Sequence, residues 1–331
     1  MEKNSIIDSI RNVYSKYCMK RYLKDAVRTE QKYLLQYNGA IGTLSDTSKL
    51  ENRIRICVHG IEKGFSHRNV RPAFGVDKIA CLLDLLRIYV GLEGFNKRFC
   101  EDCLSTIKYY LDQFSSNDKI SDIKITYQRI VSIVDAKIEA RNATINISKA
   151  DVDKILSGID YEEFIASRHS CRFFTKVPVD QTLLEKAFKI AEHTPTACNR
   201  QAQKVYVFRG DQKQKLLNIS PSRSFVEEID TALLVTVDMR AYFSDEAWQC
   251  YVDGGLYAMN LLNAIHSTGL GCIPLTASVY AVSKRKELCD TFNIPLNEAP
   301  IICIGVGNRE DNYQVNASYR RPFSDYVSYI K

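Results

Sequence analysis

The sequence predicts an α+β protein, in which an all-helical N-terminal region over residues 1–150 precedes a layered domain over residues 157–331. Apolar side chains recur at helical spacing up to about residue 140, which predicts one helix after another. Beyond the stretch 141–150, which loses this spacing and is the candidate linker, helices alternate with short apolar strands. Such alternation by itself indicates a sheet covered by helices, in either an α/β or an α+β arrangement.

Composition and charge narrow the class of protein. An apolar fraction of 45% with 25% charged residues is typical of a soluble globular protein. The net charge of +6 is spread along the chain, so it does not indicate a nucleic-acid partner. The chain shows neither a signal peptide nor an apolar run of about 18 residues, and its 11 cysteines are scattered through predicted helices and strands. We therefore expect a cytoplasmic protein without a membrane partner.

Cys100 and Cys103 form a C-x-x-C spacing within a predicted helix. No second pair follows at the spacing of a zinc site, and no histidine lies close. We therefore expect buried thiols and no metal site, with a redox or metal-binding pair as the alternative.

In the N-terminal region, the clearest helix is the one whose apolar residues fall on a single face. These residues are Ile79, Leu82, Leu83, Leu86 and Val90. Breaks between helices are predicted where turn residues gather, at 38–39, 42–45, 69–75 and 115–118.

The layered domain is expected to contain four strands and three main helices. The strands are expected at 204–209, 232–237, 270–275 and 300–306, and the helices at 181–193, 245–268 and 282–292. The face of the helix 245–268 that we assign inward comprises Tyr251, Gly254, Gly255, Ala258, Leu261, Leu262 and Ile265. Each glycine costs a helix about 1 kcal/mol relative to alanine, so a close contact should offset the cost. That contact is either with the sheet of the same subunit or with a partner helix in a dimer.

The most specific string, 168–179, begins with Arg168, Ser170 and Arg172. Two guanidinium groups four residues apart can bind a phosphate or an electron-rich ring edge through charge-assisted hydrogen bonds. Taken alone, such a string is more typical of a solvated surface than of a binding site.

A second string, 195–201, follows the helix 181–193 and combines small, hydroxyl and amide side chains. Thr196, Asn199 and Gln201 suit a loop that hydrogen-bonds a polar cofactor. An ordinary helix-to-strand turn is the alternative for this loop in isolation.

These two strings, in this order, resemble the opening of the nitroreductase family. Later pieces follow in the family's order: 253–255 up to 269–271 resembles its long central helix, 274–278 its flavin-contacting loop, 301–307 its last core strand and 320–322 its C-terminal basic motif. The resemblance covers about half of the chain. It implies a three-layer domain, with a central, mostly antiparallel sheet flanked by helices, and a homodimer with FMN at its interface. The N-terminal region is similar to the helical extension of some polysaccharide-cluster members.

The resemblance also implies roles for particular residues. Arg168 and either Arg320 or Arg321 would neutralise the FMN phosphate. Arg172 would lie near the pyrimidine edge of the flavin ring, where a cation stabilises the reduced form. Asn199 and Gln201 would act from the partner subunit, and the backbone of 275–277 would face flavin N5. The complete implied set is Arg168, His169, Ser170, Arg172, Thr196, Asn199, Gln201, Pro274, Leu275, Thr276, Ala277, Arg320 and Arg321.

The sequence departs from the family pattern at two points. Ala202 follows Gln201 where the family commonly has Pro-Trp, and Ser278 stands where a glycine is frequent. The domain is also short for the family, which suggests a reduced lid and an N-terminal half that covers the site instead.

These implications lead to one preferred function and one alternative. The preferred function is an oxidoreductase that transfers hydride from NADH or NADPH, through flavin N5, to a small electron-poor acceptor in a ping-pong cycle. The flavin carries this chemistry, so no catalytic side chain is expected. The alternative is a protein of the same fold that binds flavin or another ligand without turnover, with its N-terminal half as a partner-binding module.

One N-terminal stretch, 59–75, combines His59, Lys63 and Arg71 with several glycines. Three interpretations of this stretch are open. It is a solvated helix end, or these three side chains line a substrate mouth over the flavin, or it forms a partner-binding surface.

Overall fold

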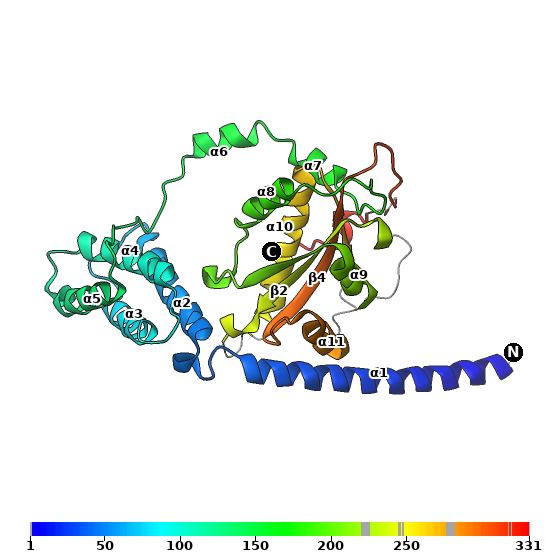
Figure 1. Ribbon diagram of the computed structural model, residues 1–331, viewed down its shortest axis with the longest axis horizontal. Coiled ribbons are helices and arrows are strands. Elements are labelled where there is room, and N and C mark those ends of the chain that lie inside the picture. Colours follow the sequence, from blue (N-terminus) through cyan, green and yellow to red (C-terminus); the bar gives the residue numbers. More distant parts are fainter. Residues whose placement is uncertain are drawn as a thin grey trace.

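The computed structural model describes residues 2–219, 226–243, 246, 248–275, 282–316, 318 and 320–330. An all-helical N-terminal part precedes a four-stranded sheet flanked by helices, which confirms the predicted α+β class (Figure 1). Within these residues, no helix combines the length and the apolar character that crossing a membrane requires.

The N-terminal part consists of five helices: α1 (Glu2–Tyr37), α2 (Thr47–Phe65), α3 (Val76–Tyr89), α4 (Lys97–Gln113) and α5 (Ser121–Val134). Helices α2 to α5 share one apolar core, which includes the predicted face of α3. Side chains cap two of these helices: Asp46, next to the break predicted at 42–45, accepts from the Lys49 amide, and Asn96, outside the predicted breaks, accepts from the Phe99 amide.

Both thiols of the C-x-x-C spacing are buried in this core, as expected. Burial raises the pKa of Cys100 to about 12 and also raises the pKa of Cys103, so neither thiol ionises near neutral pH. Among the described residues, no group of histidine, cysteine, aspartate and glutamate side chains could hold a metal ion.

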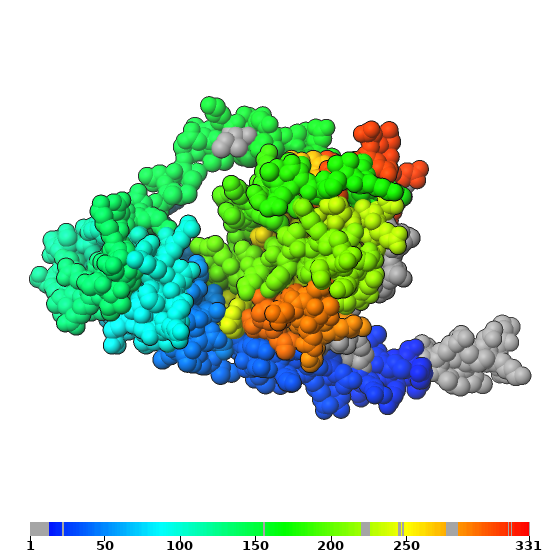
Figure 2. Space-filling model, viewed as in Figure 1, coloured from blue at the N-terminus to red at the C-terminus, as the bar shows by residue number. Residues whose placement is uncertain are grey.

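The connection between the two parts is an irregular stretch, 136–148, followed by α6 (Lys149–Leu156) and α7 (Tyr161–Ser167). This connection arches away from the parts that it joins (Figure 2). The short helix α7 was not expected from the sequence. It ends at the string 168–172, so it forms the approach to the first motif.

The sheet contains β1 (Gln203–Phe208), β2 (Thr231–Asp238), β3 (Gly271–Leu275) and β4 (Glu298–Gly307) in the order β1-β2-β4-β3, with every neighbouring pair antiparallel. Helices α8 (Gln181–Ala191) and α10 (Gln249–Ser267) pack on one face, and α9 (Gly210–Ile219) and α11 (Val282–Phe292) on the other. Successive side chains of β2 point to opposite faces of the sheet. Leu233 and Val235 enter the core under α8 and α10, whereas Ala232 and Leu234 enter the core under α9 and α11. The predicted strands and helices are confirmed to within a few residues, but helix α9 was missed.

Helix α10 corrects one assignment made from the sequence. Gly254 packs against the sheet as expected, and a Cβ added there would lie 2.5 Å from Ile301 Cγ1. Gly255 was assigned to the same face but is exposed, with open space where its Cβ would be. Adjacent helical residues point about 100° apart, so the two glycines serve different faces of the helix.

Helix α1 joins the two parts by packing on the sheet-containing part. It lies alongside α11 (Figure 1), and Tyr33 belongs to a core cluster that includes Val237 and Met239. The buried carboxylate of Glu30 accepts a hydrogen bond of 2.6 Å from Tyr251 Oη. It also lies 3.6 Å from the guanidinium of Arg285, which is 2% exposed.

Candidate functional site

The string 168–172 lies along the outer edge of β3. The Cys171 amide donates to the Cys272 carbonyl at 3.0 Å, and a bridge pairs Ser170 with Cys272. Cys171 itself is buried, so the residues on either side of it point the other way. As a result, Ser170 and Arg172 line the same cavity, which we call the Arg168 cavity.

The Arg168 cavity has a volume of about 850 Å³ and gathers residues from both ends of the domain. It brings together five side chains that the sequence singled out: Arg168, His169, Ser170, Arg172 and Arg320. The remaining lining residues are Tyr161, Glu162, Ile165 and Ala166 around α7, Met259 of α10, and Val315, Asn316 and Ser318. Glu162 is the one carboxylate in this lining.

Arg168 has unmet hydrogen-bonding capacity. Its Nη1 atom is buried and has no hydrogen-bond partner among the described residues. A buried donor without a partner costs about 1–3 kcal/mol, and more when it is charged. An anionic ligand in the cavity could satisfy this atom, so the donor set fits the phosphate of a nucleotide cofactor.

The positive charge of the cavity acts on a nearby histidine. His266 lies 2.8 Å from Ser167 Oγ, at the end of α7. Burial lowers its pKa, and the charges of Arg309, Arg168 and His169 lower it further. The positive charges of Arg309, Arg168 and His169 therefore oppose protonation of His266.

The structure separates the two C-terminal arginines. Arg320 lines the Arg168 cavity, whereas the guanidinium of Arg321 stacks over the Tyr326 ring, 5.1 Å from its centroid. Of the two candidates for the phosphate contact, only Arg320 is placed for it.

The second string forms a strained loop between α8 and β1. Cys198, Asn199 and Gln201 all have positive φ angles, of 50°, 53° and 52°. This conformation costs a residue with a side chain roughly 1–2 kcal/mol, and it persists only where the surroundings enforce it. Within the loop, the Gln201 amide donates to Thr196 Oγ1 at 3.1 Å and Gln201 Nε2 donates to Asn199 Oδ1 at 3.1 Å.

Two buried charges hold this loop, and the sequence reasoning missed both. Asp253 of α10 accepts from the Ala197 amide at 3.1 Å, and also from Tyr242 Oη and Gln249 Nε2, both at 2.8 Å. Arg200, which is buried, donates to Glu246 Oε1 at 2.7 Å. Burial opposes ionisation of Glu246, but the hydrogen bonds that it accepts outweigh burial and lower its pKa. Asp253 could have been recognised from the sequence, because it is a carboxylate on the inner face of a predicted helix.

Asn199 and Gln201 do not line the Arg168 cavity. They line a separate cleft of about 250 Å³, whose other wall comes from the helical part and includes Arg55, His59 and Glu62 of α2. The two motifs predicted to hold one cofactor therefore face different spaces within one chain.

The third predicted segment is described only in part. Pro274 and Leu275 lie in β3, in register with Ile304 and Cys303, and the Leu275 side chain is buried in the core. Neither residue lines the Arg168 cavity. Thr276 and Ala277, together with Ser278, lie outside the described residues.

The stretch 59–75 does not converge on one opening. His59 lines the cleft that contains Asn199 and Gln201. Arg71 lines a different cavity within the helical part, and Lys63 lines that cavity too. The three side chains of the proposed substrate mouth therefore share no single opening, although His59 and Lys63 both line a third one together with residues 140–146.

Comparison with known proteins gives a family match over part of the chain. Residues 165–247 match the model of the nitroreductase family, a range that contains both the string 168–172 and the loop 196–201. A search of curated proteins found no match to this chain.

Solved structures of nitroreductase-family proteins resemble the C-terminal half. An FMN complex from Desulfovibrio desulfuricans, classed as a nitroreductase, is 20% identical, with 52% of this chain and 98% of that chain covered and a TM-score of 0.45. A nitroreductase family protein of Streptococcus pneumoniae is 22% identical, with 52% and 100% covered and a TM-score of 0.44. One from Clostridium difficile 630 is 21% identical, with 52% and 99% covered and a TM-score of 0.44. These similarities concern the fold.

Proposed function

With the nitroreductase-family match over residues 165–247 as the premise, we propose that this protein is an FMN-dependent oxidoreductase that passes hydride from NADH or NADPH to a small electron-poor acceptor. The Arg168 cavity carries the proposal, because it combines a buried guanidinium nitrogen that lacks a partner with Ser170, Arg172 and Arg320. Arg168, Arg320 and the Ser170 hydroxyl suit a phosphate, Arg172 adds a third positive charge, and about 850 Å³ is within the usual range for a cofactor site.

Each residue of the cavity has a distinct task in this proposal. Arg168 and Arg320 bind the FMN phosphate, and Ser170 donates its hydroxyl. Arg172 supplies positive charge near the pyrimidine edge, where it stabilises the charge that the ring gathers on reduction. When bound, FMN supplies a hydride acceptor and donor at N5. The family resemblance alone assigns the segment 274–277 to that side of the ring, since neither Pro274 nor Leu275 lines the cavity. The chain itself contributes position, charge and exclusion of water.

We further propose a homodimer in which the partner's loop 196–201 completes the cofactor site. The support is an exposed apolar stripe along α10, formed by Trp248, Val252, Leu256 and Met259, with the open position of Gly255 beside it. Met259 also lines the Arg168 cavity, so a second copy seated on this stripe would border the cavity. The partner's Asn199 and Gln201 could then contact a cofactor in this Arg168 cavity, whereas the same residues do not line the Arg168 cavity of their own subunit.

The dimer is tested with Leu256→Glu, which places a charge in the middle of the stripe. We expect a wild-type dimer in light scattering, and a monomer that loses FMN for the variant, because burying an unpaired carboxylate costs several kcal/mol. The matched control is Ile125→Glu, at an exposed apolar position of α5. A wild-type monomer that binds FMN tightly would exclude this arrangement.

The proposed reaction is tested by adding NADH or NADPH to the FMN-loaded protein without oxygen. We expect the flavin absorption band to bleach with at least one of them, and to return when a quinone or nitroaromatic acceptor is added. Bound FMN that neither cofactor bleaches would favour the alternative, a flavin-binding protein without turnover. Protein that stays colourless in excess FMN would reject both functions.

A further inference from the structure

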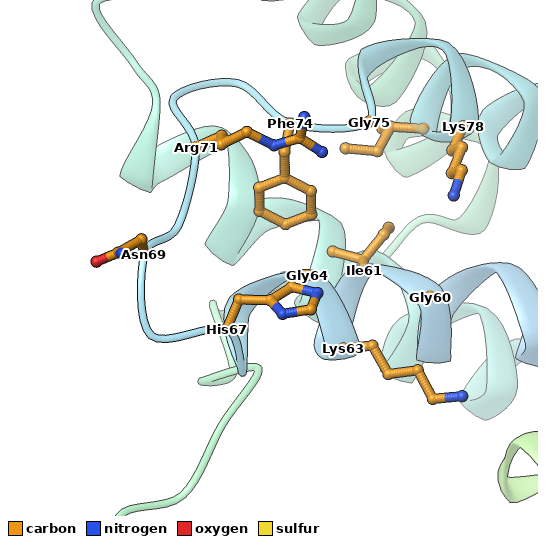
Figure 3. A pocket seen from close by; sticks show the side chains of 11 residues that line it. Gly60, Ile61, Lys63, Gly64, His67, Asn69, Arg71, Phe74, Gly75 and Lys78 are labelled. Carbon is orange, nitrogen blue, oxygen red and sulfur yellow. The ribbon is translucent and has the colours of Figure 1, made fainter.

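A second cavity lies within the helical part, remote in sequence from every FMN motif (Figure 3). It lies between α2, the loop 66–75 and the start of α3, and has a volume of about 360 Å³. Four of its lining residues are basic: Lys63 of α2, His67 and Arg71 of the loop, and Lys78 of α3. Among the described residues, none that lines this cavity is acidic.

The basic side chains of this cavity have no counterions in the described part of the chain. The side chains of Lys63, Arg71 and Lys78 form no ion pair or hydrogen bond there. The nearest glutamate in sequence, Glu62, pairs instead with His59 at 3.2 Å. Three positive charges on exposed side chains around a concave surface raise the local concentration of anions.

The cavity wall is held in shape by specific contacts. The Phe74 ring packs directly on the backbone of α2, because a Cβ added at Gly64 would lie 2.0 Å from the ring (Figure 3). Tyr110 Oη donates to the Phe74 carbonyl at 2.8 Å. The next residue back, Ala73, has a φ of 50°, a strained conformation that these contacts impose. The loop that carries Arg71 is therefore preformed.

The floor of the cavity adds backbone donors and apolar surface. Gly75, with a φ of 64°, precedes the first turn of α3, and no side chain caps that turn. Its amide groups supplement the cations, as helix N-termini do for anions. Asp77 lies in this turn but does not line the cavity. Ile61, Phe74 and Ile79 supply an apolar surface beside the charges.

We propose that this cavity binds the phosphate or diphosphate group of a small organic molecule. Arg71, Lys63 and Lys78 contact the phosphate oxygens, and Phe74 contacts the organic part. Three cations without counterions suit a multiply charged anion better than a single carboxylate. The site is separate from the Arg168 cavity, so this proposal does not depend on the proposed flavin chemistry.

The test is calorimetric titration of inorganic pyrophosphate into the full-length protein at low ionic strength, with one equivalent of FMN per chain so that no free FMN competes for the cavity. We expect one site whose affinity falls with added salt. Arg71→Gln and Lys78→Gln are each expected to weaken binding by about tenfold, the effect of removing one charged hydrogen-bond donor. Both side chains are exposed, so the variants should fold.

Two control variants and a control ligand make the test decisive. Arg98→Gln removes an exposed guanidinium from α4, outside the cavity, and should leave the affinity unchanged. Arg168→Gln should also leave the affinity for pyrophosphate unchanged. Weaker binding by this variant would place the anion in the Arg168 cavity. Absent binding, equal losses in Arg71→Gln and Arg98→Gln, or equally tight binding of malonate would each overturn the proposal.

Discussion

Arg168 and Arg320 show how local structure assigns different tasks to side chains with the same charge. The buried Nη1 atom of Arg168 lacks a partner among the described residues, and Arg320 lines the same cavity from the far end of the chain. Arg321 differs from Arg320 by one position, but its guanidinium is engaged by the Tyr326 ring. Equal charge therefore does not imply equal access to a ligand.

This difference yields a matched pair of variants. Arg320→Gln is expected to weaken FMN binding by about ten- to a hundredfold, the effect of losing one charge-assisted contact of about 1.5–3 kcal/mol. Arg321→Gln is expected to change it by less than about threefold, because only distant, screened charge is lost. Flavin fluorescence titration measures both. Similar losses in the two variants would show that Arg320 has no special role.

His266 gives a prediction for the pH dependence of stability. Its pKa is lowered in the folded protein, first by burial and then by Arg309, Arg168 and His169. The unfolded chain therefore binds the proton more readily. The contribution of His266 to stability is fully present above about pH 6.5 and is lost as the pH falls through that value towards the lower, folded pKa.

The melting temperature should accordingly fall less in His266→Gln than in the wild type between pH 7.5 and pH 5.5. Wild type and variant are compared by calorimetry in the same buffers, so that other titrating groups contribute equally to both. An equal fall in melting temperature in the two proteins would mean that the nearby cations do not affect the protonation of His266.

Among the elements, α10 contributes to each part of the proposed site. Its inner face packs on the sheet, Asp253 holds the loop 196–201, and Met259 lines the Arg168 cavity. Its outer face carries the apolar stripe. A helix that is apolar on both sides is difficult to orient from sequence, which explains why Gly255 was assigned to the wrong face.

The neighbouring glycines of α10 test this orientation. Gly254→Ala should reduce the free energy of unfolding by about 1–3 kcal/mol, because the added methyl group overlaps Ile301. Gly255→Ala meets open space within the subunit and should be neutral or stabilising by up to about 1 kcal/mol. Urea unfolding ranks the two variants. The reverse ranking would contradict the orientation of the helix.

The loop 196–201 shows what a sequence motif leaves open. Its hydroxyl and amide side chains predicted polar contacts. Its three residues with positive φ could not be predicted, because the loop contains no glycine, the residue that usually adopts this conformation. Two buried ties that form only on folding hold the strained loop: Asp253 accepts from the Ala197 amide, and Arg200 of the loop donates to Glu246. We therefore attribute the geometry of this loop to its environment.

Across the whole molecule, α1 ties the helical part to the sheet-containing part. The buried guanidinium of Arg285 stacks over the Tyr33 ring, 4.3 Å from its centroid, and its nearest carboxylate belongs to Glu30. Both partners belong to α1, which precedes the linker predicted at 141–150 by more than 100 residues. A fragment that begins at residue 150 would lose both of them.

Glu30→Ala tests this connection. The variant leaves Arg285 buried without its carboxylate and Tyr251 without its acceptor, so we expect a loss of about 3–5 kcal/mol in the free energy of unfolding. Asp290→Ala, which removes an exposed ion pair with Lys286 on α11, should cost less than about 1 kcal/mol. Equal effects in chemical denaturation would show that the α1 contact does not stabilise the protein.

The sequence by itself determined the fold class, the positions of the four strands and the first motif of the Arg168 cavity. These features depend on periodicity and on residue types at short spacing, which are local properties of a chain. The string 168–172 predicted its chemistry because its two arginines lie within five consecutive positions of one edge segment.

Only the tertiary structure decided which distant groups share a space. It placed Arg320 with Arg168, separated Asn199 and Gln201 from them, and divided the stretch 59–75 between a cleft and a cavity of its own. The physical reason is that cavities and buried ion pairs are formed by side chains far apart in sequence. Their meeting depends on how whole helices pack on the sheet, which local spacing does not encode.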